Sequence, residues 1–443
     1  MPQTLIRNAT IIAVSTDAAA DESTDILIDG DQIVAMGRDL VSADAEVVDG
    51  SERIILPGFV NAHQHTWQTA LRGMSYDWTL LEYLQQVHGS LAPRFTPEDI
   101  HIGTLVGALN QIDCGTTTLG DWCHNNPTTE HTDAALDALE SSGIRTVFLH
   151  GTPPLKPGAS GGPSKHPKAE LQRLLSRFPS GNGNRLNIGM AIPGPLYSPL
   201  EVALADSQLA QEFGVVVSFH HSGGVPADEN AWVALEEARL LGPHTNIVHG
   251  NHIDDDLLKR LVDSGVSFTV TPEVEMSDGH GHPITGRLRA LGSAPSIGID
   301  IETAISGDML TATRIALAHQ RALDYAAVRS ESGPFELRSP IEAQEALAWA
   351  TIHGARALGL SDSIGSLEPG KQADLIVIDA RSLNLWPVHD PVTTALQAKP
   401  SNIEAVMIAG KWQKRHGRLT HMGIASLQDE LAESAERVAS DSP

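Results

Sequence analysis

Short apolar runs rich in β-branched residues alternate with longer segments of helical period between about residue 54 and residue 300. Parallel strands need a crossover between them, and that crossover is usually a helix. Eight repeats of this unit predict an α/β fold, a closed (β/α)8 TIM barrel. The predicted strands are Ile54–Val60, Thr116–Trp122, Arg145–His150, Leu186–Ile192, Val215–His220, Thr245–His249, Val266–Thr271 and Pro295–Asp300, and the predicted helices include Pro97–Ile112, Asp133–Ser142, Pro199–Phe213 and Asp254–Val262.

Strand-like runs also occur near both ends of the chain, outside the barrel repeat. Leu5–Val14 and Asp25–Gly37 lie near the start, and the second of these is broken by a turn at Asp29-Gly30-Asp31. Asp374–Asp379 and Ile403–Gly410 lie near the end. Neither end has enough apolar residues for a core of its own, so we predict one small β-sandwich domain built from both termini.

This pattern divides the chain into four parts. Residues 1–56 and 361–421 are predicted to form the two halves of the β-sandwich, and residues 57–360 are predicted to form the barrel. Residues 422–443 remain as a C-terminal helix and tail. Apolar residues recur with helical spacing over Ile424–Val438, so we expect this helix to pack on the body of the protein or on a dimer partner.

The composition restricts the possible partners. The chain has 443 residues, with 30 Lys plus Arg against 55 Asp plus Glu, and a formal net charge of −25. Such a surface repels nucleic acid and anionic membranes, and no apolar run approaches the roughly 20 residues that span a bilayer. Cys114 and Cys123 are too few for a disulfide framework, and residues 1–30 lack a signal-peptide pattern. We therefore expect a cytoplasmic enzyme with a small-molecule substrate.

Side chains that ligate metals stand at the ends of four predicted strands. The first strand ends with His63-Gln64-His65, and residues two apart on a strand face the same side, so both imidazoles face the mouth of the barrel. The fifth strand ends with His220-His221, the sixth with His249 and the eighth with Asp300. Imidazole and carboxylate ligands suit a divalent cation that activates water. His220 and His221 point to opposite sides of their strand, so only one of them can face the cation.

Taken together, these features resemble the amidohydrolase superfamily, in particular its cytosine-deaminase-like and triazine-hydrolase-like branch. The resemblance covers nearly the whole chain and implies a metal-bearing catalytic barrel with a composite β-sandwich, commonly assembled as a homodimer or higher homo-oligomer. The segments that carry it are Leu56–His65, Arg72-Gly73, Cys114–Thr118, the histidines at the strand ends, Gly298–Asp300 and the tail motif Gly365–Leu375.

The resemblance also implies roles for individual residues. His63, His65 and His220 are implied as metal ligands. Asp300 is implied as a further ligand and as the proton shuttle, and His249 is implied as a polarising or ligating group.

The choice of the third histidine and the number of metals also follow from the family pattern. The ligand stands six residues after Gly214 in that pattern, which favours His220 over His221. The branch with two metals carries a carbamylated lysine at the end of strand four, and Leu186–Ile192 contains no lysine. One divalent metal per chain is therefore expected. Zinc is the first choice, iron or manganese are alternatives, and a binuclear site is the rival.

One position departs from the pattern of the deaminating relatives. These carry a glutamate three residues after the ligand histidine, which passes a proton to a ring nitrogen of the substrate, and here that residue is Gly223. Glu273 is the nearest candidate by topology for the missing acid, and an ordinary loop carboxylate is the alternative. We assign Trp67, Gln68 and His280 to contacts with a planar substrate.

The implied reaction is hydrolysis of a carbon–nitrogen bond other than a peptide bond. A metal-bound hydroxide would attack an sp2 carbon of a small, cyclic nitrogenous substrate, with His249, Asp300 and Glu273 as catalytic groups. Deamination of a purine, pyrimidine or triazine-like ring is preferred because it is frequent in the family. Cyclic amide hydrolysis and hydrolytic dechlorination use the same residues. A non-catalytic binding barrel is the alternative from another class.

Overall fold

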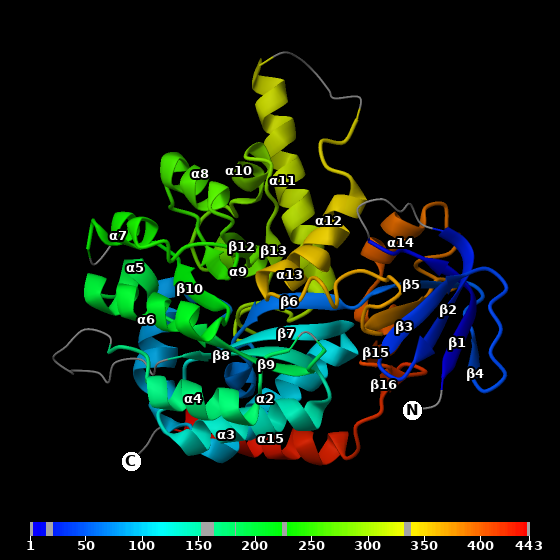
Figure 1. Ribbon diagram of the computed structural model, residues 1–443, viewed down its shortest axis with the longest axis horizontal. Helices are drawn as coiled ribbons and strands as arrows, with labels where there is room; N and C mark the ends of the chain where they lie inside the picture. The colour runs from blue at the N-terminus through cyan, green and yellow to red at the C-terminus, as the bar shows by residue number, and fades with distance from the viewer. Residues whose placement is uncertain are drawn as a thin grey trace.

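A parallel eight-stranded barrel forms the centre of the molecule in the computed structural model (Figure 1). The structure describes residues 3–14, 21–151, 164–181, 183–223, 228–331 and 338–440. Neighbouring barrel strands follow one another in chain order, which confirms the predicted TIM barrel. The strands are β6 (Phe59–Gln64), β7 (Thr116–Cys123), β8 (Arg145–Gly151), β9 (Leu186–Ala191), β10 (Val217–His221), β11 (Thr245–His249), β12 (Ser267–Val270) and β13 (Ser296–Ile297).

Backbone hydrogen bonds between the first and last strands close the barrel. The amide of Asp300, just past β13, donates to the carbonyl of His63 at 2.9 Å. The amide of His65 donates in turn to the carbonyl of Asp300 at 2.8 Å. The buried Asn61 side chain supports this closure, since its Oδ1 accepts from the amides of His63 and Ile299. Residues of the predicted ligand set therefore form the closing ladder itself.

Helices cover the outside of the barrel, and the four predicted helices are confirmed. The longest of the described helices, α11, projects from the body in Figure 1. The main helices are α2 (Pro97–Asp113), α3 (Thr129–Ser142), α4 (Lys168–Arg177), α6 (Leu200–Phe213), α7 (Ala231–Glu237), α8 (Asp255–Asp263), α10 (Thr285–Ala290), α11 (Met309–Glu331), α12 (Ala343–Trp349) and α13 (Ile352–Ala357).

Shorter helical segments follow several strands at the mouth of the barrel. Thr79 caps the first α-helical segment, since its hydroxyl accepts from the amide of Glu82 while the Glu82 carboxylate accepts from the amide of Thr79. These segments are η1 (Thr66–Leu71), α1 (Leu80–Tyr83), η2 (Leu84–Leu91), η3 (Ala92–Arg94), α5 (Gly194–Tyr197) and α9 (Pro272–Ser277).

Both ends of the chain contribute to one separate sheet, as predicted. Strand β5 joins the two halves, because it pairs in parallel with β1 and antiparallel with β14. The sheet contains β1 (Thr4–Ile11), β2 (Asp21–Asp29), β3 (Gln32–Gly37), β4 (Glu46–Asp49), β5 (Arg53–Pro57), β14 (Leu375–Asp379), β15 (Ile403–Ile408), β16 (Lys411–Arg415) and β17 (Arg418–Leu419), and α14 (Pro391–Gln397) and η4 (Pro400–Asn402) lie in the segment between β14 and β15.

The prediction of one barrel strand over Ile54–Val60 was wrong. The chain passes from the terminal sheet to the barrel within this run, at Gly58, whose amide donates to the carbonyl of Asp374 at 3.1 Å. A Cβ at Gly58 would lie 2.0 Å from the side chain of Thr117. The apolar pattern continues unbroken because both strands are buried, so periodicity alone does not reveal the boundary.

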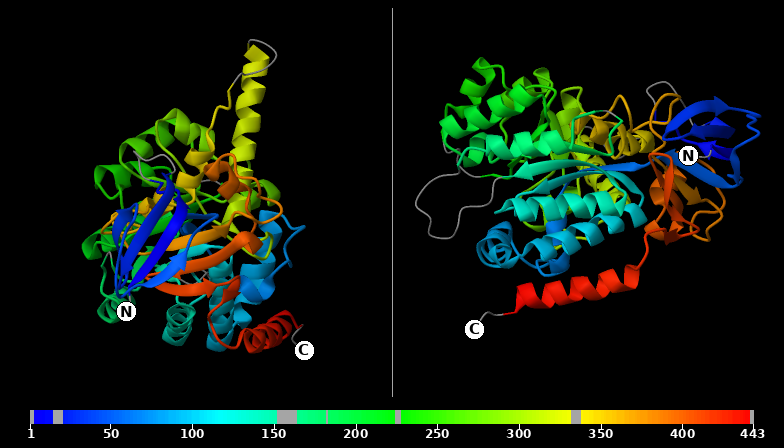
Figure 2. Two further views of the ribbon diagram at one scale, coloured as in Figure 1. Left: turned by 90° about the vertical axis from the view of Figure 1, so that its right-hand side faces the viewer. Right: turned by 60° about the horizontal axis from the view of Figure 1, so that its bottom comes forward.

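The C-terminal helix α15 (Ile424–Ala439) packs against α2, along the lower edge of the body in Figure 2. Its Val438 is fully buried, and its Ser434 hydroxyl donates to Asp99 Oδ1 at 2.6 Å. Packing on the body was one of the two expectations for this helix. No helix among the described residues has the length and apolarity needed to cross a membrane.

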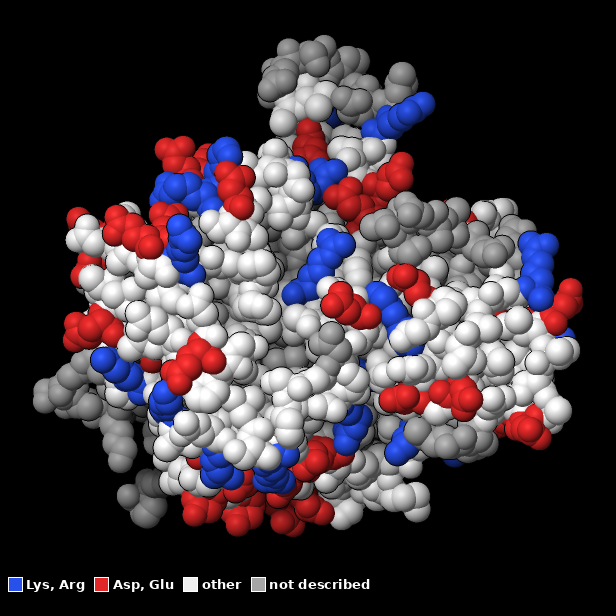
Figure 3. Space-filling model, viewed as in Figure 1, with Lys and Arg blue, Asp and Glu red and all other residues white. Residues whose placement is uncertain are grey.

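Charged side chains of both signs are mixed on the surface. On the face shown in Figure 3, Lys and Arg lie among Asp and Glu. Arg173 and Arg177 of α4, for example, pair with Asp133 and Asp137 of α3. The described residues on this face therefore form no extended basic surface.

A buried ion pair joins the barrel to the terminal sheet. Arg145, at the start of β8, is fully buried and donates to both carboxylate oxygens of Asp374, at 2.6 and 3.1 Å. Its remaining donors reach the carbonyl of Asn184 and the side chain of Gln372. Asp374 also accepts from the amide of Ala409 at 2.7 Å. Nearly all the hydrogen-bonding capacity of the pair is therefore satisfied.

We predict that Arg145→Met lowers the free energy of unfolding by about 3–5 kcal/mol, because it leaves the carboxylate of Asp374 buried without its counter-charge. Urea unfolding followed by circular dichroism measures this loss. Lys168→Met is the matched control, since Lys168 and Glu212 are about half exposed and such pairs contribute less than about 1 kcal/mol. An equal effect of the two substitutions would contradict the structural role of Arg145.

Candidate metal centre at the mouth of the barrel

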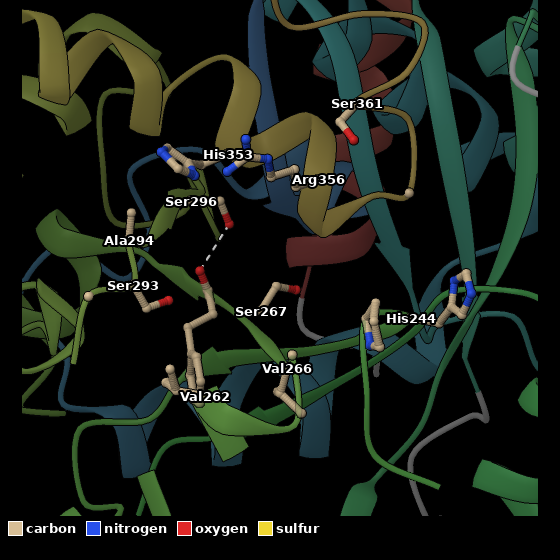
Figure 4. A pocket seen from close by; sticks show the side chains of 15 residues that line it. His244, Val262, Val266, Ser267, Ser293, Ala294, Ser296, His353, Arg356 and Ser361 are labelled. Atoms are coloured by element: carbon tan, nitrogen blue, oxygen red, sulfur yellow. Dashed lines mark hydrogen bonds between the residues drawn. The ribbon is translucent and has the colours of Figure 1, made fainter. Parts of the chain in front are cut away.

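Two cavities lie at opposite ends of the barrel strands. One, of about 510 Å³, is lined by residues that precede β11, β12 and β13, such as His244, Val266 and Ala294 (Figure 4). Of its described lining residues only Arg356 carries a permanent charge, and Ser296 donates to the carbonyl of Phe268. Active sites of this fold lie at the other end of the strands, and the other cavity, of about 360 Å³, lies there.

Three imidazoles and one carboxylate converge beside this second cavity. His63 Nε2 lies 3.2 Å from His220 Nε2 and 3.3 Å from Asp300 Oδ1. His65 Nε2 lies 3.5 Å from the same carboxylate oxygen. One donor atom from each of these four residues lies within 4.8 Å of the other three. His63 lies in β6 and His65 just after it, His220 lies in β10, and Asp300 follows β13. These elements therefore bring four potential ligands together.

The spacing and chemistry of these donors fit a divalent metal ion. Ligands about 2.0–2.2 Å from a tetrahedral metal lie about 3.3–3.6 Å from one another. The three shortest separations described above, 3.2, 3.3 and 3.5 Å, are close to this range, and every separation in the cluster is within 4.8 Å. His65 Nδ1 lies 2.7 Å from the carbonyl of Trp122, so the ring donates there and its Nε2 keeps a free lone pair. The four residues therefore form a site suited to a divalent cation.

Unusual backbone conformations place two of the side chains at the site. His249 and Asp300 have φ angles of 72° and 67°, in the left-handed region that non-glycine residues rarely adopt. Asp300 is held there by its two backbone hydrogen bonds to β6. Such conformations persist where the surrounding structure enforces them, and they occur often at functional sites.

The electrostatics of Asp300 suit a permanently ionised ligand. Burial alone would raise its pKa, but the hydrogen bond and charge of His63, together with His249 and His65, hold it well below its usual range. Burial lowers the pKa of His65 to about 3, and the neighbouring His63 adds to this effect. A charged carboxylate thus faces neutral imidazoles, which are the protonation states that metal binding requires.

His249 lies beside the cluster, and Thr271 and Glu275 contact the side of its ring that faces away from Asp300. Its Nε2 lies 3.7 Å from Asp300 Oδ2, and its Nδ1 lies 3.1 Å from the Thr271 hydroxyl and 3.4 Å from Glu275 Oε1. Burial alone would lower the pKa of His249, but the hydrogen bond to Glu275 and the charges of Asp300 and Glu275 raise it. Glu275 itself is fixed by the amide of Thr271 at 2.7 Å. The contacts of Nδ1 with Thr271 and Glu275 therefore fix the ring of His249, with its Nε2 on the side of Asp300.

The two adjacent histidines of β10 have different surroundings. The His220 ring stacks on the rings of His65 and His249, at centroid distances of 5.3 and 5.5 Å. The His221 ring faces Trp232 at 5.9 Å and lies outside the cluster.

The other predicted site residues divide into one that lines the cavity and three that do not. His280 lines it and is 3% exposed. Trp67 is fully buried against Phe95, and Gln68 donates to the hydroxyl of Tyr83 at 2.6 Å. Glu273 is neither among the residues that line the cavity nor part of the cluster.

Several cavity residues were not predicted from the sequence. Tyr83 and His88 come from the helical segments after β6, and the His88 ring contacts the Tyr83 hydroxyl at 3.1 Å and His124 at 3.2 Å. Trp122 lies one residue before the end of β7, and its ring centroid is 4.4 Å from that of His220. Asp278 follows α9 and also lines the cavity. The position of Trp122 near a strand end was the one signal in the sequence that could have indicated a cavity residue. The helical segments after β6, which carry Tyr83 and His88, gave no such signal.

Comparison with known proteins agrees with the fold and the motifs. The model of the amidohydrolase family matches residues 54–413. A 5-methylthioadenosine/S-adenosylhomocysteine deaminase of Symbiobacterium thermophilum is 30% identical over 433 residues, 93% of each chain. An 8-oxoguanine deaminase of Pseudomonas aeruginosa is 28% identical over 96% of this chain and 97% of that protein. The structure of an atrazine chlorohydrolase from Arthrobacter aurescens complexed with zinc has a TM-score of 0.85 at 23% identity, over 98% of this chain and 100% of that one, so the two share a fold.

The buried histidines predict how stability depends on pH. Unfolded histidine has a pKa of about 6.5, so between about pH 6.5 and pH 4 the unfolded chain takes up protons that the folded chain does not. The free energy of unfolding therefore falls as the pH falls through this range, by about 1.4 kcal/mol per pH unit for each net proton. Burial lowers the pKa to about 3 or 4 in His65, His88, His150, His166, His221, His280 and His353.

Carboxyl groups with a raised pKa act in the opposite direction but are outnumbered. Burial raises the pKa of Asp121 and Asp206 to about 6 and that of Asp278 to about 7, so these groups favour the folded state as the pH falls. We expect the midpoint of urea unfolding, measured with a chelator present, to fall steeply below pH 6. His150→Asn should flatten this dependence, and replacement of the exposed His389 should leave it unchanged. A midpoint that is constant from pH 7 to pH 4.5 would contradict the prediction.

Proposed function

We propose that this chain, which belongs to the amidohydrolase family, is a metal-dependent aminohydrolase that removes an amino group from a nitrogenous ring. The observation that carries this proposal is the convergence of His63, His65, His220 and Asp300 beside a cavity that also contains His249. The sequence relatives matched over most of their length are named as deaminases of purine-type compounds. A purine, pyrimidine or triazine-like ring is therefore the proposed substrate class.

We assign the metal to one zinc ion per chain, held by His63, His65, His220 and Asp300. The distances within the cluster support a single centre, and the described strand β9 contributes no lysine that could bridge a second one. The structural neighbour complexed with zinc supports the choice of zinc. When bound, the cation supplies Lewis-acid activation of water at this point.

Asp300 and His249 move and hold protons in the proposed reaction. Asp300 Oδ1 faces the cluster and its Oδ2 faces His249, so the carboxylate is placed to take a proton from water and return it to the leaving amine. The Nε2–H of His249 donates to the oxygen that forms on the attacked carbon, where negative charge develops. Glu275 is a positioning residue, because it acts on the substrate only through His249.

The cavity suits a flat and largely apolar ring. Trp122, Tyr83, Leu80 and Ile301 line it together with the polar groups of the site. A volume of about 360 Å³ lies within the range of small-molecule sites, and such sites commonly combine apolar walls with a few polar groups. This geometry supports an aromatic heterocycle as substrate.

We predict that the purified chain contains one equivalent of zinc, measured by inductively coupled plasma mass spectrometry. His63→Ala, His220→Ala and Asp300→Ala should each lower the metal content at least tenfold, because each removes one of four ligands. His221→Ala is the matched control, since His221 faces Trp232, and it should keep the metal. Metal loss in His221→Ala with retention in His220→Ala would overturn the ligand assignment.

We predict ammonia release from at least one amino-substituted ring, tested with 5-methylthioadenosine, 5′-deoxyadenosine, 8-oxoguanine, cytosine and aminotriazines. Glu275→Gln should lower kcat/KM about 10- to 100-fold with the thermal midpoint nearly unchanged, because the support of His249 is weakened. Chloride release from chlorotriazines, or ring opening of cyclic amides without ammonia release, would instead identify dechlorination or amide hydrolysis as the reaction.

A further inference from the structure

By the resemblance of the sequence, deaminating relatives carry a proton-transferring glutamate at the position of Gly223. In this chain the position has little room for a side chain. Gly223 has a φ of +115°, a conformation that residues with side chains rarely adopt. A Cβ at this position would lie 2.8 Å from the ring of His252. Gly223 has no side chain, and a larger residue in this conformation would crowd His252, so a deaminase built on this chain must take its acid from another element.

Asp278 supplies a carboxyl group to the same cavity. It follows α9, lines the cavity together with His249 and Asp300, and is 3% exposed. Neither of its carboxyl oxygens has a hydrogen-bond partner in the described structure. Its backbone is fixed, because its carbonyl accepts from the amide of Leu80 at 2.9 Å. Buried polar groups normally have partners, so this carboxyl group is available for a ligand.

A second buried group on the same loop also lacks partners. His280 lines the cavity, is 3% exposed, and neither of its ring nitrogens is hydrogen-bonded. Its ring lies 4.6 Å from that of His249. The loop after α9 thus presents two unsatisfied polar side chains to the cavity that also contains His249 and Asp300. This arrangement suits a substrate edge that offers both donors and acceptors.

The ionisation of Asp278 is compatible with proton donation. Burial raises the pKa of its carboxyl group to about 7, and the negative charge of Asp300 contributes to this shift. Besides Asp300, the other titratable side chains that line the cavity are Tyr83, Tyr197, His65, His88, His124, His220, His249 and His280. A carboxyl group that exchanges its proton near neutral pH can both give and recover it during turnover.

We propose that Asp278 performs the task of the absent glutamate: it recognises the N=C–NH2 edge of the substrate and protonates the ring nitrogen. This inference rests on the proposed function, since it assigns the second acid of the same site. It narrows the substrate class to rings in which a nitrogen adjoins the amino-bearing carbon. A carboxyl group pairs with such an edge through two parallel hydrogen bonds.

The proton balance of the reaction closes with two carboxyl groups. Water forms the new C–O bond and loses one proton to Asp300, while the C=N electron pair moves to the ring nitrogen, which takes the proton of Asp278. The C–NH2 bond then breaks, and the departing nitrogen takes the proton from Asp300 and leaves as ammonia. The hydroxyl proton of the tetrahedral adduct passes to Asp278 as the C=O bond forms. One water is consumed, one ammonia is released, and both carboxyl groups return to their starting states.

Binding of two isomers tests the recognition step without any need for turnover. In 2-aminoquinoline the ring nitrogen adjoins the amino-bearing carbon, and in 3-aminoquinoline it does not. By isothermal titration calorimetry we expect the wild-type chain with its metal to bind the 2-isomer at least about 10-fold more tightly, as expected for hydrogen bonds to an ionisable group. Asp278→Leu should abolish this preference, and Asp278→Asn should retain part of it, because an amide can still make two hydrogen bonds.

Turnover of the amine identified by the ammonia screen tests the proton transfer. Asp278→Asn should lower kcat by at least about 100-fold, because the amide cannot donate the proton that a general acid supplies. Asp278→Glu should recover part of this loss. Glu273→Gln separates the two candidate acids, and a loss of kcat in that variant with normal kcat in Asp278→Asn would overturn the assignment.

The outcomes also separate this inference from the proposed function. Equal binding of the two isomers by the wild-type chain, or an unchanged preference in Asp278→Leu, would overturn the role of Asp278 whether or not ammonia is released. An intact, Asp278-dependent preference in a chain that releases no ammonia from any amine would support the recognition role and overturn the aminohydrolase proposal.

Discussion

The barrel closes at the same residues that form the candidate metal centre. The register of the barrel and the positions of the ligands therefore depend on the same hydrogen bonds. The amide and carbonyl of Asp300 complete the ladder to β6, while its carboxylate faces His63 and His65. A shift of one residue in this register would turn each side chain to the opposite face. Fold and site are thus specified by one set of hydrogen bonds, so the ligand geometry is as rigid as the barrel itself.

The strand-end residues were predictable because two simple rules of strand geometry determine them. Side chains two apart on β6 share a face, which predicts His63 and His65 together, and parallel strands end at one rim, which adds His249 and Asp300. The choice between His220 and His221 needed the family pattern, because adjacent residues offer no internal criterion. The apolar run at Gly58 conceals a change of sheet for a similar reason, since strands buried on both faces do not alternate.

Residues that depend on the course of short helical segments escaped prediction. Trp67 follows the paired histidines in sequence, but the 3-10 turn η1 carries it into the core against Phe95, and Trp122 takes its place at the cavity. In the segment after β12 the chain forms the helix α9 rather than an extended loop. That geometry brings Glu275, and not Glu273, to His249. Local sequence contains the correct residue types here, and only tertiary structure decides which of two carboxylates reaches the site.

The burial of the cluster explains why a cation would stabilise it. His63, His65 and His220 are packed together and deprived of water, and burial lowers the pKa of each. His63 Nε2 lies within hydrogen-bond distance of both His220 Nε2 and Asp300 Oδ1, and in a neutral ring this nitrogen is either a donor or an acceptor, so it fully satisfies only one of the two contacts. A divalent cation at this point satisfies all four groups at once, and its binding free energy adds to that of folding. The same logic applies to Asp278 and His280, whose polar atoms also lack protein partners. The two parts of the cavity therefore differ: one gathers donor atoms suited to a divalent cation, and the other presents polar atoms without protein partners.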